Sequence, residues 1–231
     1  KTWGGVFDEF TQRTVFKLIT RGYFEGLESP ISIGKESNVF SALKKDGTRL
    51  IAKIYRLETC DFNRMYDYIK GDPRYLKIRK GKRNIVFSWA QREYRNLFKA
   101  RELQVNVPTP IAFLNNVLVL EFIGYENQAA PKLKDKIPAN PQDFFNQIIE
   151  SMKKLHKGNL VHGDLSAFNI LNFSERPIFI DFSQATPLEN SGAHKFLERD
   201  IINICNFFRK IGLKIEDDAV KRYITEGKWT S

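Results

Sequence analysis

The chain has 231 residues, of which 42% are apolar and 13% aromatic, so it can bury a core and is not a disordered chain. Its length suits one large domain or two small lobes. Only two cysteines occur, which excludes a disulfide scaffold and a cysteine-rich zinc fold and favours a reducing, cytoplasmic compartment. No apolar run approaches the ~18 residues of a transmembrane helix, so we expect no membrane partner.

Positive charge is concentrated in the first part of the chain. The first 100 residues hold 21 Lys and Arg against 11 Asp and Glu, which accounts for the whole net charge of +10. The densest stretch, Arg74 to Arg83, contains six basic residues and no acid. Such a field suits a polyanion, with nucleic acid as the first hypothesis. The alternatives are that this stretch is a solvated loop without a partner or that it binds a membrane surface.

The first predicted element is a helix over residues 8–20, which Asp8 can cap and Gly22 can end. Residues 31–55 have a strand-like pattern with a hairpin turn at Asp46-Gly47. Residues 57–84 lose this periodicity and are predicted to form a mobile, basic insertion. The next predicted elements are a helix over 85–101 and strands over 111–114 and 117–122.

The second half of the chain is predicted to be mainly helical. A boundary near residue 124 would separate it from the β-rich first half and create a cleft between two lobes, a usual place for a ligand. The predicted elements are a connector over 124–139, a helix over 143–156, short strands around 170–171 and 178–181, and a helix from 193 to 210 and beyond.

The strongest chemical signal is the segment from His162 to Asn169, which reads His-Gly-Asp-Leu-Ser-Ala-Phe-Asn and is followed by Asp181 after an apolar run. Phosphoryl transfer needs a carboxylate near the attacking oxygen and oxygen ligands for Mg²⁺ on the phosphates. Asp164 fits the first requirement, and Asn169 with Asp181 fits the second. A loop of satisfied polar residues is the alternative.

Lys53 provides a second signal, because it shares a strand face with Ile51 and Tyr55. An ammonium on an apolar face is costly unless it is paired, and phosphates or a carboxylate would pair it. Glu93 in the helix over 85–101 is the best candidate. The alternatives are that Lys53 snorkels to water and that Glu93 is simply a solvent-facing acid.

A third signal is the loop that begins at Gly34, nineteen residues before Lys53. Gly34 permits a tight turn, and Lys35, Ser37 and Asn38 offer hydrogen-bond donors to phosphate oxygens. The loop is not a Walker motif, and alone it is weak evidence.

These residues resemble the protein-kinase-like superfamily from about Ser32 onward and, more closely, a RIO kinase. The closer resemblance rests on Gly34–Val39 in place of a glycine-rich loop, on the insertion before Glu93, and on the segments His162–Ser166 and Ile180–Gln184. The Rio-one subfamily is favoured, because a winged-helix module, which the Rio-two type carries, has no room before Ser32. The lack of extra tails resembles the compact archaeal form.

The resemblance implies an α+β, two-lobed protein-kinase-like fold with a β-rich N-lobe and a reduced, mainly helical C-lobe. Its parts would be a helical extension over 1–30, an N-lobe over 31–123 with a flexible basic insertion over 57–84, and a C-lobe over 124–231.

The resemblance also implies roles for single residues, with ATP and Mg²⁺ as cofactors and Mn²⁺ as an alternative metal. The catalytic set would be Asp164, Asp181, Lys53 and Glu93, and the metal ligands would be Asn169 and Asp181. The ATP-binding set would be Ile33, Lys35, Glu36, Ser37, Asn38, Val39, Lys53, Leu120, Glu121 and Ile123.

By the same resemblance, the chain would be an atypical serine/threonine kinase and ATPase that phosphorylates itself and acts in maturation of the small ribosomal subunit. Its partners would be the pre-ribosomal subunit, the RNA of that subunit and a protein substrate, with the oligomeric state left open.

Two other classes of protein compete with this interpretation. A small-molecule phosphotransferase of the aminoglycoside or choline kinase kind would normally have a larger helical C-terminal region. A nucleotide-binding assembly factor without turnover conflicts with the complete set of catalytic residues.

Two departures from ordinary protein kinases bear on regulation. Gly163 stands where an Arg normally reads a phosphorylated activation loop. Ser183 replaces a Gly after Asp181-Phe182, which limits backbone flipping there. We therefore expect no regulation of the ordinary activation-loop kind.

Overall fold

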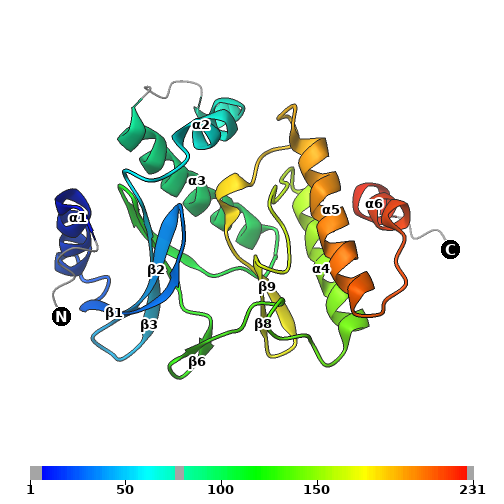
Figure 1. The fold of residues 1–231 in the computed structure, drawn as a ribbon, viewed down its shortest axis with the longest axis horizontal. Helices are drawn as coiled ribbons and strands as arrows, with labels where there is room; N and C mark the ends of the chain where they lie inside the picture. Colours follow the sequence, from blue (N-terminus) through cyan, green and yellow to red (C-terminus); the bar gives the residue numbers. More distant parts are fainter. Residues whose placement is uncertain (1–6, 76–80, 228–231) are drawn as a thin grey trace. The chain divides into compact units, whose positions relative to one another are not determined.

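The computed structural model describes residues 7–75 and 81–227, and the chain divides into two compact units. Unit 1 comprises Lys1–Tyr94 and Thr109–Phe122, and unit 2 comprises Arg95–Pro108 and Ile123–Ser231. Unit 1 contains an antiparallel sheet, and unit 2 is mainly helical (Figure 1). The predicted α+β fold with a β-rich first part is confirmed, while the bounds given to the domains stay predictions.

The sheet of unit 1 has five strands, and every neighbouring pair is antiparallel. The predicted hairpin turn is present, since Gly47 has φ +83° and the Thr48 N–H donates to Asp46 at 2.9 Å. In spatial order the strands are β1 (Gly26–Ile33), β2 (Ser37–Leu43), β3 (Arg49–Tyr55), β5 (Val117–Glu121) and β4 (Pro110–Leu114).

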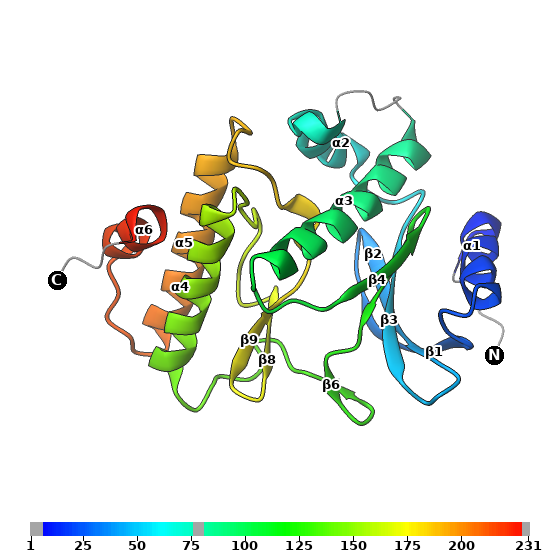
Figure 2. The same ribbon diagram turned by 180° about the vertical axis from the view of Figure 1, so that it is seen from behind.

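The two faces of this sheet have different roles. Residues opposite one another in antiparallel strands point to the same face. Phe40 lies opposite Ala52, and both belong to the core that packs against α1 (Glu9–Thr20). Figure 2 shows this helix beside the sheet. Val39 and Leu118 lie opposite Lys53 on the other face, which is therefore the face that carries the predicted lysine.

The first helix begins and ends where the sequence predicts. Asp8 caps α1 by accepting a hydrogen bond from the Thr11 N–H at 2.9 Å. The helix ends at Thr20, and Gly22 follows with φ +79°, a conformation that suits glycine at a helix end. Local capping chemistry therefore determines both bounds of this element.

In the described part of residues 57–84, the structure differs from the sequence prediction, which found no helical period there. The structure contains α2 (Phe62–Lys70), the short helix η1 (Pro73–Tyr75) and the start of α3 (Lys82–Glu102) in this segment. Met65 and Ile69 of α2 are buried in a cluster with Trp89 of α3. The period was missed because only these apolar positions repeat among charged and aromatic neighbours. Part of the basic stretch, with Lys77, Arg79 and Lys80, lies outside the described residues.

In the described residues, unit 2 contains the end of α3, the helices α4, α5 and α6, and two two-stranded sheets. Phe145 of α4 packs edge-to-face on Phe208 of α5 with ring centroids 5.2 Å apart, and α6 packs against both helices (Figures 1 and 2). The elements are β6 (Gly124–Tyr125), β7 (Gln128–Ala129), α4 (Pro141–Lys157), β8 (Ile170–Phe173), β9 (Arg176–Phe179), η2 (Phe182–Gln184), α5 (Ala193–Lys210) and α6 (Asp217–Glu226).

Two predictions made from composition can be compared with the structure. Cys60 and Cys205 are both unpaired and buried, and burial raises their pKa values to about 11 and about 12. Among the helices of the described residues, none is long and apolar enough to cross a membrane.

Candidate active site

Unit 1 brings Lys53 and Glu93 together, as the sequence predicts. The Lys53 Nζ lies 2.9 Å from a carboxylate oxygen of Glu93, although the two residues are 40 positions apart. Both side chains are buried, with exposed fractions of 9% and 1%. A buried charge is tolerated when it is paired and hydrogen-bonded, so each residue requires the other.

Tyr55 completes this pair, and sequence analysis did not assign it a role. Its hydroxyl donates to the second carboxylate oxygen of Glu93, and its ring lies 5.2 Å from the Lys53 Nζ. The signal was present in the sequence, because Tyr55 follows Lys53 by two residues on the same strand face. The Glu93 carboxylate is thus held from two directions.

The face of the sheet that carries Lys53 also carries other predicted nucleotide-binding residues. Val39 is directly opposite Lys53, and Leu120 is opposite Ile51, which shares the face of Lys53. The structure therefore brings Val39, Lys53 and Leu120 onto one surface of unit 1.

The loop between β1 and β2 makes the tight turn expected from Gly34. The Gly34 N–H donates to the Ser37 carbonyl at 2.9 Å, and a Cβ on Gly34 would lie 3.0 Å from that oxygen. Ile33 and Lys35 are exposed, and Glu36 is half-buried. A side chain at the glycine position would crowd this turn.

Asn38 lies in β2, and the sequence analysis expected it to offer a hydrogen-bond donor to phosphate oxygens. Asn38 is 5% exposed, and its side-chain oxygen accepts a hydrogen bond from Arg56 at 3.0 Å. The side-chain carbonyl of this buried residue therefore faces Arg56, and a role of Asn38 in binding phosphate stays a prediction. The interaction with Arg56 holds the start of β2 against the end of β3.

Glu121 and Ile123, both members of the predicted ATP-binding set, belong to different units. Glu121 ends β5, and its carboxylate accepts from both the backbone N–H and the hydroxyl of Thr109 at 2.9 and 2.6 Å. The Ile123 carbonyl in unit 2 accepts from the Ala130 N–H at 2.9 Å. The Glu121 side chain is therefore occupied by a turn, which leaves only backbone groups for a base.

In unit 2 the β8–β9 hairpin brings Asn169 and Asp181 to one end. The first residue of β8, Ile170, pairs with the last residue of β9, Phe179. Beyond this pair the Ile180 N–H donates to the Asn169 carbonyl at 3.0 Å. The two predicted metal ligands therefore flank the same end of an antiparallel pair, although they are twelve positions apart.

Asn169 is also bound to Asp164. Its side-chain nitrogen donates to the Asp164 backbone carbonyl at 2.8 Å and lies 3.3 Å from a carboxylate oxygen of Asp164. Because the amide nitrogen faces Asp164, the amide oxygen is the end of Asn169 that remains for a metal. Asp164, Asn169 and Asp181 thus form one cluster.

His162 orients the backbone next to Asp181. Its Nδ1 accepts from the Asp164 N–H at 3.3 Å, so its Nε2 carries the proton and donates to the Ile180 carbonyl at 3.1 Å. Its ring also packs on Phe182 with centroids 4.6 Å apart. The histidine therefore connects the loop of Asp164 with the loop of Asp181.

Asp181 itself has an uncommon backbone conformation, with φ +64° and ψ +66°. The left-handed region is disfavoured for a residue with a side chain and persists where its surroundings hold it. The Ser183 hydroxyl donates to the Asp181 carboxylate at 2.7 Å. Ser183, which replaces the glycine of ordinary kinases, thus takes part in fixing this carboxylate.

Asp200 of α5 positions the loop of Asp164, and sequence analysis did not identify it. Its two carboxylate oxygens accept from the N–H groups of Gly163 and Leu165, both at 2.8 Å, so they bracket Asp164. Burial raises the pKa of Asp200 to about 7, against the opposing effect of the two N–H donors. The Asp164 charge raises this pKa further.

The backbone conformation and close surroundings of Gly163 explain why no Arg stands at this position. Gly163 has φ +80°, and a Cβ would lie 2.9 Å from the Gln184 carbonyl oxygen. Glycine alone meets both conditions without strain. Its replacement of the regulatory Arg is therefore enforced by the close approach of the two loops.

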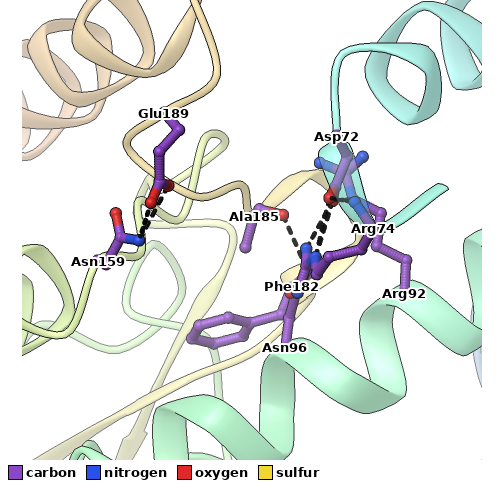
Figure 3. A network of polar contacts seen from close by, with 8 residues as sticks. All are labelled: Asp72, Arg74, Arg92, Asn96, Asn159, Phe182, Ala185 and Glu189. Atoms are coloured by element: carbon purple, nitrogen blue, oxygen red, sulfur yellow. Dashed lines mark hydrogen bonds and ion pairs between the residues drawn. The ribbon is translucent and has the colours of Figure 1, made fainter. Parts of the chain in front are cut away.

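The described part of the basic stretch is not uniformly available to a polyanion. Arg74 binds Asp72 at 2.6 Å, and Asp72 also pairs with the buried Arg92 at 3.3 Å (Figure 3). Burial lowers the pKa of Arg92 to about 10. The Lys82 Nζ lies 5.1 Å from the Phe62 ring. The absence of acids within the stretch was misleading, because Asp72 neutralises Arg74 from just outside it.

The donor set of the cluster fits a magnesium ion. Mg²⁺ prefers few protein oxygens, usually from carboxylates and amides, and keeps several waters. The Asn169 amide oxygen and the Asp181 carboxylate are such groups, and the hairpin places their backbones side by side. No cluster of three or more His, Cys, Asp or Glu suited to a metal occurs in residues 7–75 and 81–227. Because Mg²⁺ takes few protein oxygens, Asn169 and Asp181 suit a metal that also binds substrate oxygens.

The chain is similar to known proteins along most of its length. Residues 38–220 match the family model described as the RIO domain. The RIO-type serine/threonine-protein kinase Rio1 of Methanocaldococcus jannaschii is 43% identical over 226 residues, covering 97% of this chain and 77% of that protein. The protein of the same name from Haloferax volcanii is 39% identical, covering 95% and 76%.

Solved structures support the same fold. The Rio2 kinase of Chaetomium thermophilum, in its ADP/Mg²⁺–phosphoaspartate complex, superimposes with a TM-score of 0.70. The match covers 97% of this chain and 68% of that one at 24% identity. This likeness concerns the fold.

Proposed function

This chain belongs to the RIO family and is an atypical serine/threonine protein kinase; we propose that it transfers the γ-phosphoryl group of ATP through the residues described above. The observation that carries the proposal is the cluster in unit 2, where one hairpin end and one amide bring Asp164, Asn169 and Asp181 together. A carboxylate for the nucleophile and two oxygen ligands for the metal are the groups that phosphoryl transfer requires.

Unit 1 would hold the nucleotide. Lys53, fixed by Glu93, would bind phosphate oxygens, and the Gly34 turn with Lys35 and Ser37 would offer further donors. Val39, Ile33 and Leu120 would contact the adenine base, with Glu36 and Asn38 shaping the loop. The Glu121 carbonyl and the Ile123 N–H are the backbone groups that would read the edge of the base.

Unit 2 would supply the metal ligands and the catalytic carboxylate. Asn169 and Asp181 would hold Mg²⁺, or Mn²⁺ in its place, which neutralises charge on the transferred phosphoryl group. Asp164 would accept the proton of the attacking hydroxyl or water. Its carboxylate is kept in place by Asn169 and by the two backbone bonds to Asp200.

Asp181 is also the candidate acceptor in an ATPase cycle. The Rio2 relative from Chaetomium thermophilum was solved as an ADP/Mg²⁺–phosphoaspartate complex, which supports this route. In the transfer step a carboxylate oxygen of Asp181 would form the new P–O bond while the bond to the leaving ADP breaks. Water would then release phosphate and restore the carboxylate.

The biological setting that we propose is maturation of the small ribosomal subunit. The excess of ten positive charges lies in the first 100 residues, and counterion release from RNA phosphates favours such a surface. Replacing Lys77, Lys80 and Lys82 by Gln should weaken binding to small-subunit ribosomal RNA and flatten its dependence on salt. An unchanged salt slope would remove this stretch from the proposed RNA interface.

The proposed reaction is tested with γ-labelled ATP and Mg²⁺, by measuring free phosphate and protein-bound label separately. We expect both products, and we expect Asp164→Asn to lower them by roughly 100-fold or more, as for a positioned general base. A protein label that hydroxylamine removes and that is absent in Asp181→Asn would support the aspartyl-phosphate route. A hydroxylamine-stable label would favour transfer to Ser or Thr. Neither product, even with the precursor subunit added, would contradict the proposed function.

A further inference from the structure

The loop that carries Asp181 is fixed on both sides of that residue. Before it, the Ile180 N–H donates to the Asn169 carbonyl at 3.0 Å, and the Ile180 carbonyl accepts from His162 at 3.1 Å. After it, the side-chain nitrogen of Asn96 donates to the Phe182 carbonyl at 2.9 Å and to the Ala185 carbonyl at 2.8 Å (Figure 3). The backbone next to Asp181 therefore has defined partners on each side.

Asn96 is suited to this role by its place and its chemistry. It lies in α3, in the part of that helix that belongs to unit 2, and it is completely buried. An amide nitrogen offers two donors in one plane, and both are used here on carbonyls three residues apart. These carbonyls border the short helix η2, so one side chain connects its two ends.

The backbone of Asp181 needs such support. A left-handed conformation at a residue with a side chain is held only by its surroundings, and Asp181 adopts it with φ +64°. The carbonyls that Asn96 binds belong to the turn that follows directly. If the donors are lost in a buried site, the carbonyls remain without compensation and the turn is free to rearrange.

We propose that Asn96 is a positioning residue for the metal-binding carboxylate of Asp181, an inference that rests on the proposed function. Asn96 touches neither substrate nor metal. It acts by fixing the turn after Asp181, so that the carboxylate is presented to Mg²⁺ in one orientation. The competing explanation is that Asn96 only fills the core, as any side chain of its size would.

The test compares ADP affinity with and without Mg²⁺ by calorimetry, using the complete chain. Asn96→Leu keeps the branched shape of the side chain, with a somewhat larger volume, but removes both donors. Asn96→Ser is a smaller variant in case the first fails to fold. Asn172→Leu is the matched control, because Asn172 is also a buried amide of unit 2 but its side chain bonds with the Lys136 carbonyl and the Glu175 N–H.

We expect wild type and Asn172→Leu to bind ADP more tightly when Mg²⁺ is present. In the Asn96 variants this enhancement should fall roughly tenfold, as for the loss of charge-positioning hydrogen bonds, while affinity without Mg²⁺ stays the same. An enhancement that survives in Asn96→Leu or Asn96→Ser would show a merely structural role and overturn the inference. A wild type without any enhancement would instead overturn the proposed function on which it rests.

Discussion

At the scale of single residues, the Lys53–Glu93 pair is the most demanding feature of unit 1. Both charges are buried, and the Glu93 carboxylate is bound by the Lys53 ammonium and by the Tyr55 hydroxyl. Breaking a buried pair leaves an uncompensated charge, which costs more than the pair itself contributes. The pair therefore affects stability as well as nucleotide binding.

We expect Glu93→Gln to lower the free energy of unfolding by about 3 kcal/mol, because it leaves the Lys53 ammonium without its carboxylate. Urea denaturation would measure the loss. Glu102→Gln is the control, since Glu102 lies on the same helix with 68% of its side chain exposed. Its cost should stay within ~0.5 kcal/mol. Equal effects of the two substitutions would show that the buried pair has no special energetic role.

Gly163 gives a second prediction at this scale. Gly163→Ala should be destabilising by more than the ~1–2 kcal/mol of a left-handed alanine, since the new methyl also meets the Gln184 carbonyl. Gly22→Ala is a matched comparison, because Gly22 has φ +79° and nothing within 4 Å of an added Cβ. Thermal unfolding of both variants measures the difference. A smaller cost at Gly163 than at Gly22 would contradict the close approach seen here.

At the scale of elements, α5 acts as a support for the loop that carries Asp164. Arg199 donates to the Gly163 carbonyl, Asn203 donates to the Leu165 carbonyl at 3.2 Å, and Asp200 accepts from the backbone between them. One helix thus satisfies donors and acceptors on both sides of Asp164. The loop of Asp164 is therefore held by a rigid element and not by its own contacts alone.

The buried carboxyl of Asp200 predicts a pH dependence of stability. Because its pKa is raised from 3.8 to about 7 on folding, the folded state holds this proton more tightly. Its contribution to stability is present below pH ~4 and is lost as the pH rises through ~7. Wild type should therefore exceed Asp200→Asn in unfolding free energy by more at pH 5 than at pH 8. A difference that grows with pH would show that the two N–H bonds outweigh burial.

Elements with clear periods and caps were predicted well from the sequence. The helix expected from 193 to 210 and beyond begins at Ala193 but ends at Lys210, and a separate helix, α6, follows it. The helix α1 begins after the expected cap at Asp8. The helix α2 was missed because its buried apolar face is narrow and comprises only Met65 and Ile69. Its stability comes from packing on α3, and such tertiary contacts leave little local signal.

At the scale of the whole molecule, the sequence identified the chemical groups but not their supports. The side chains of Lys53, Asp164, Asn169 and Asp181 carry recognisable chemistry, so their types and spacing were sufficient to propose them as site residues. Asn96 and Asp200 bind backbone groups 35 to 89 positions away. A backbone carbonyl or N–H has no sequence identity, so no pattern could have indicated these contacts.

We propose a division of tasks between Asp164 and Asp181, which lie close together in unit 2. Calorimetric titration of Asp164→Ala and Asp181→Ala with ADP and Mg²⁺ tests it most directly. We expect Asp181→Ala to lose the Mg²⁺-dependent part of nucleotide binding, because its carboxylate is the proposed metal ligand, and Asp164→Ala to keep most of it. Equal losses in the two variants would contradict the assignment of the metal to Asp181 and of the nucleophile's proton to Asp164.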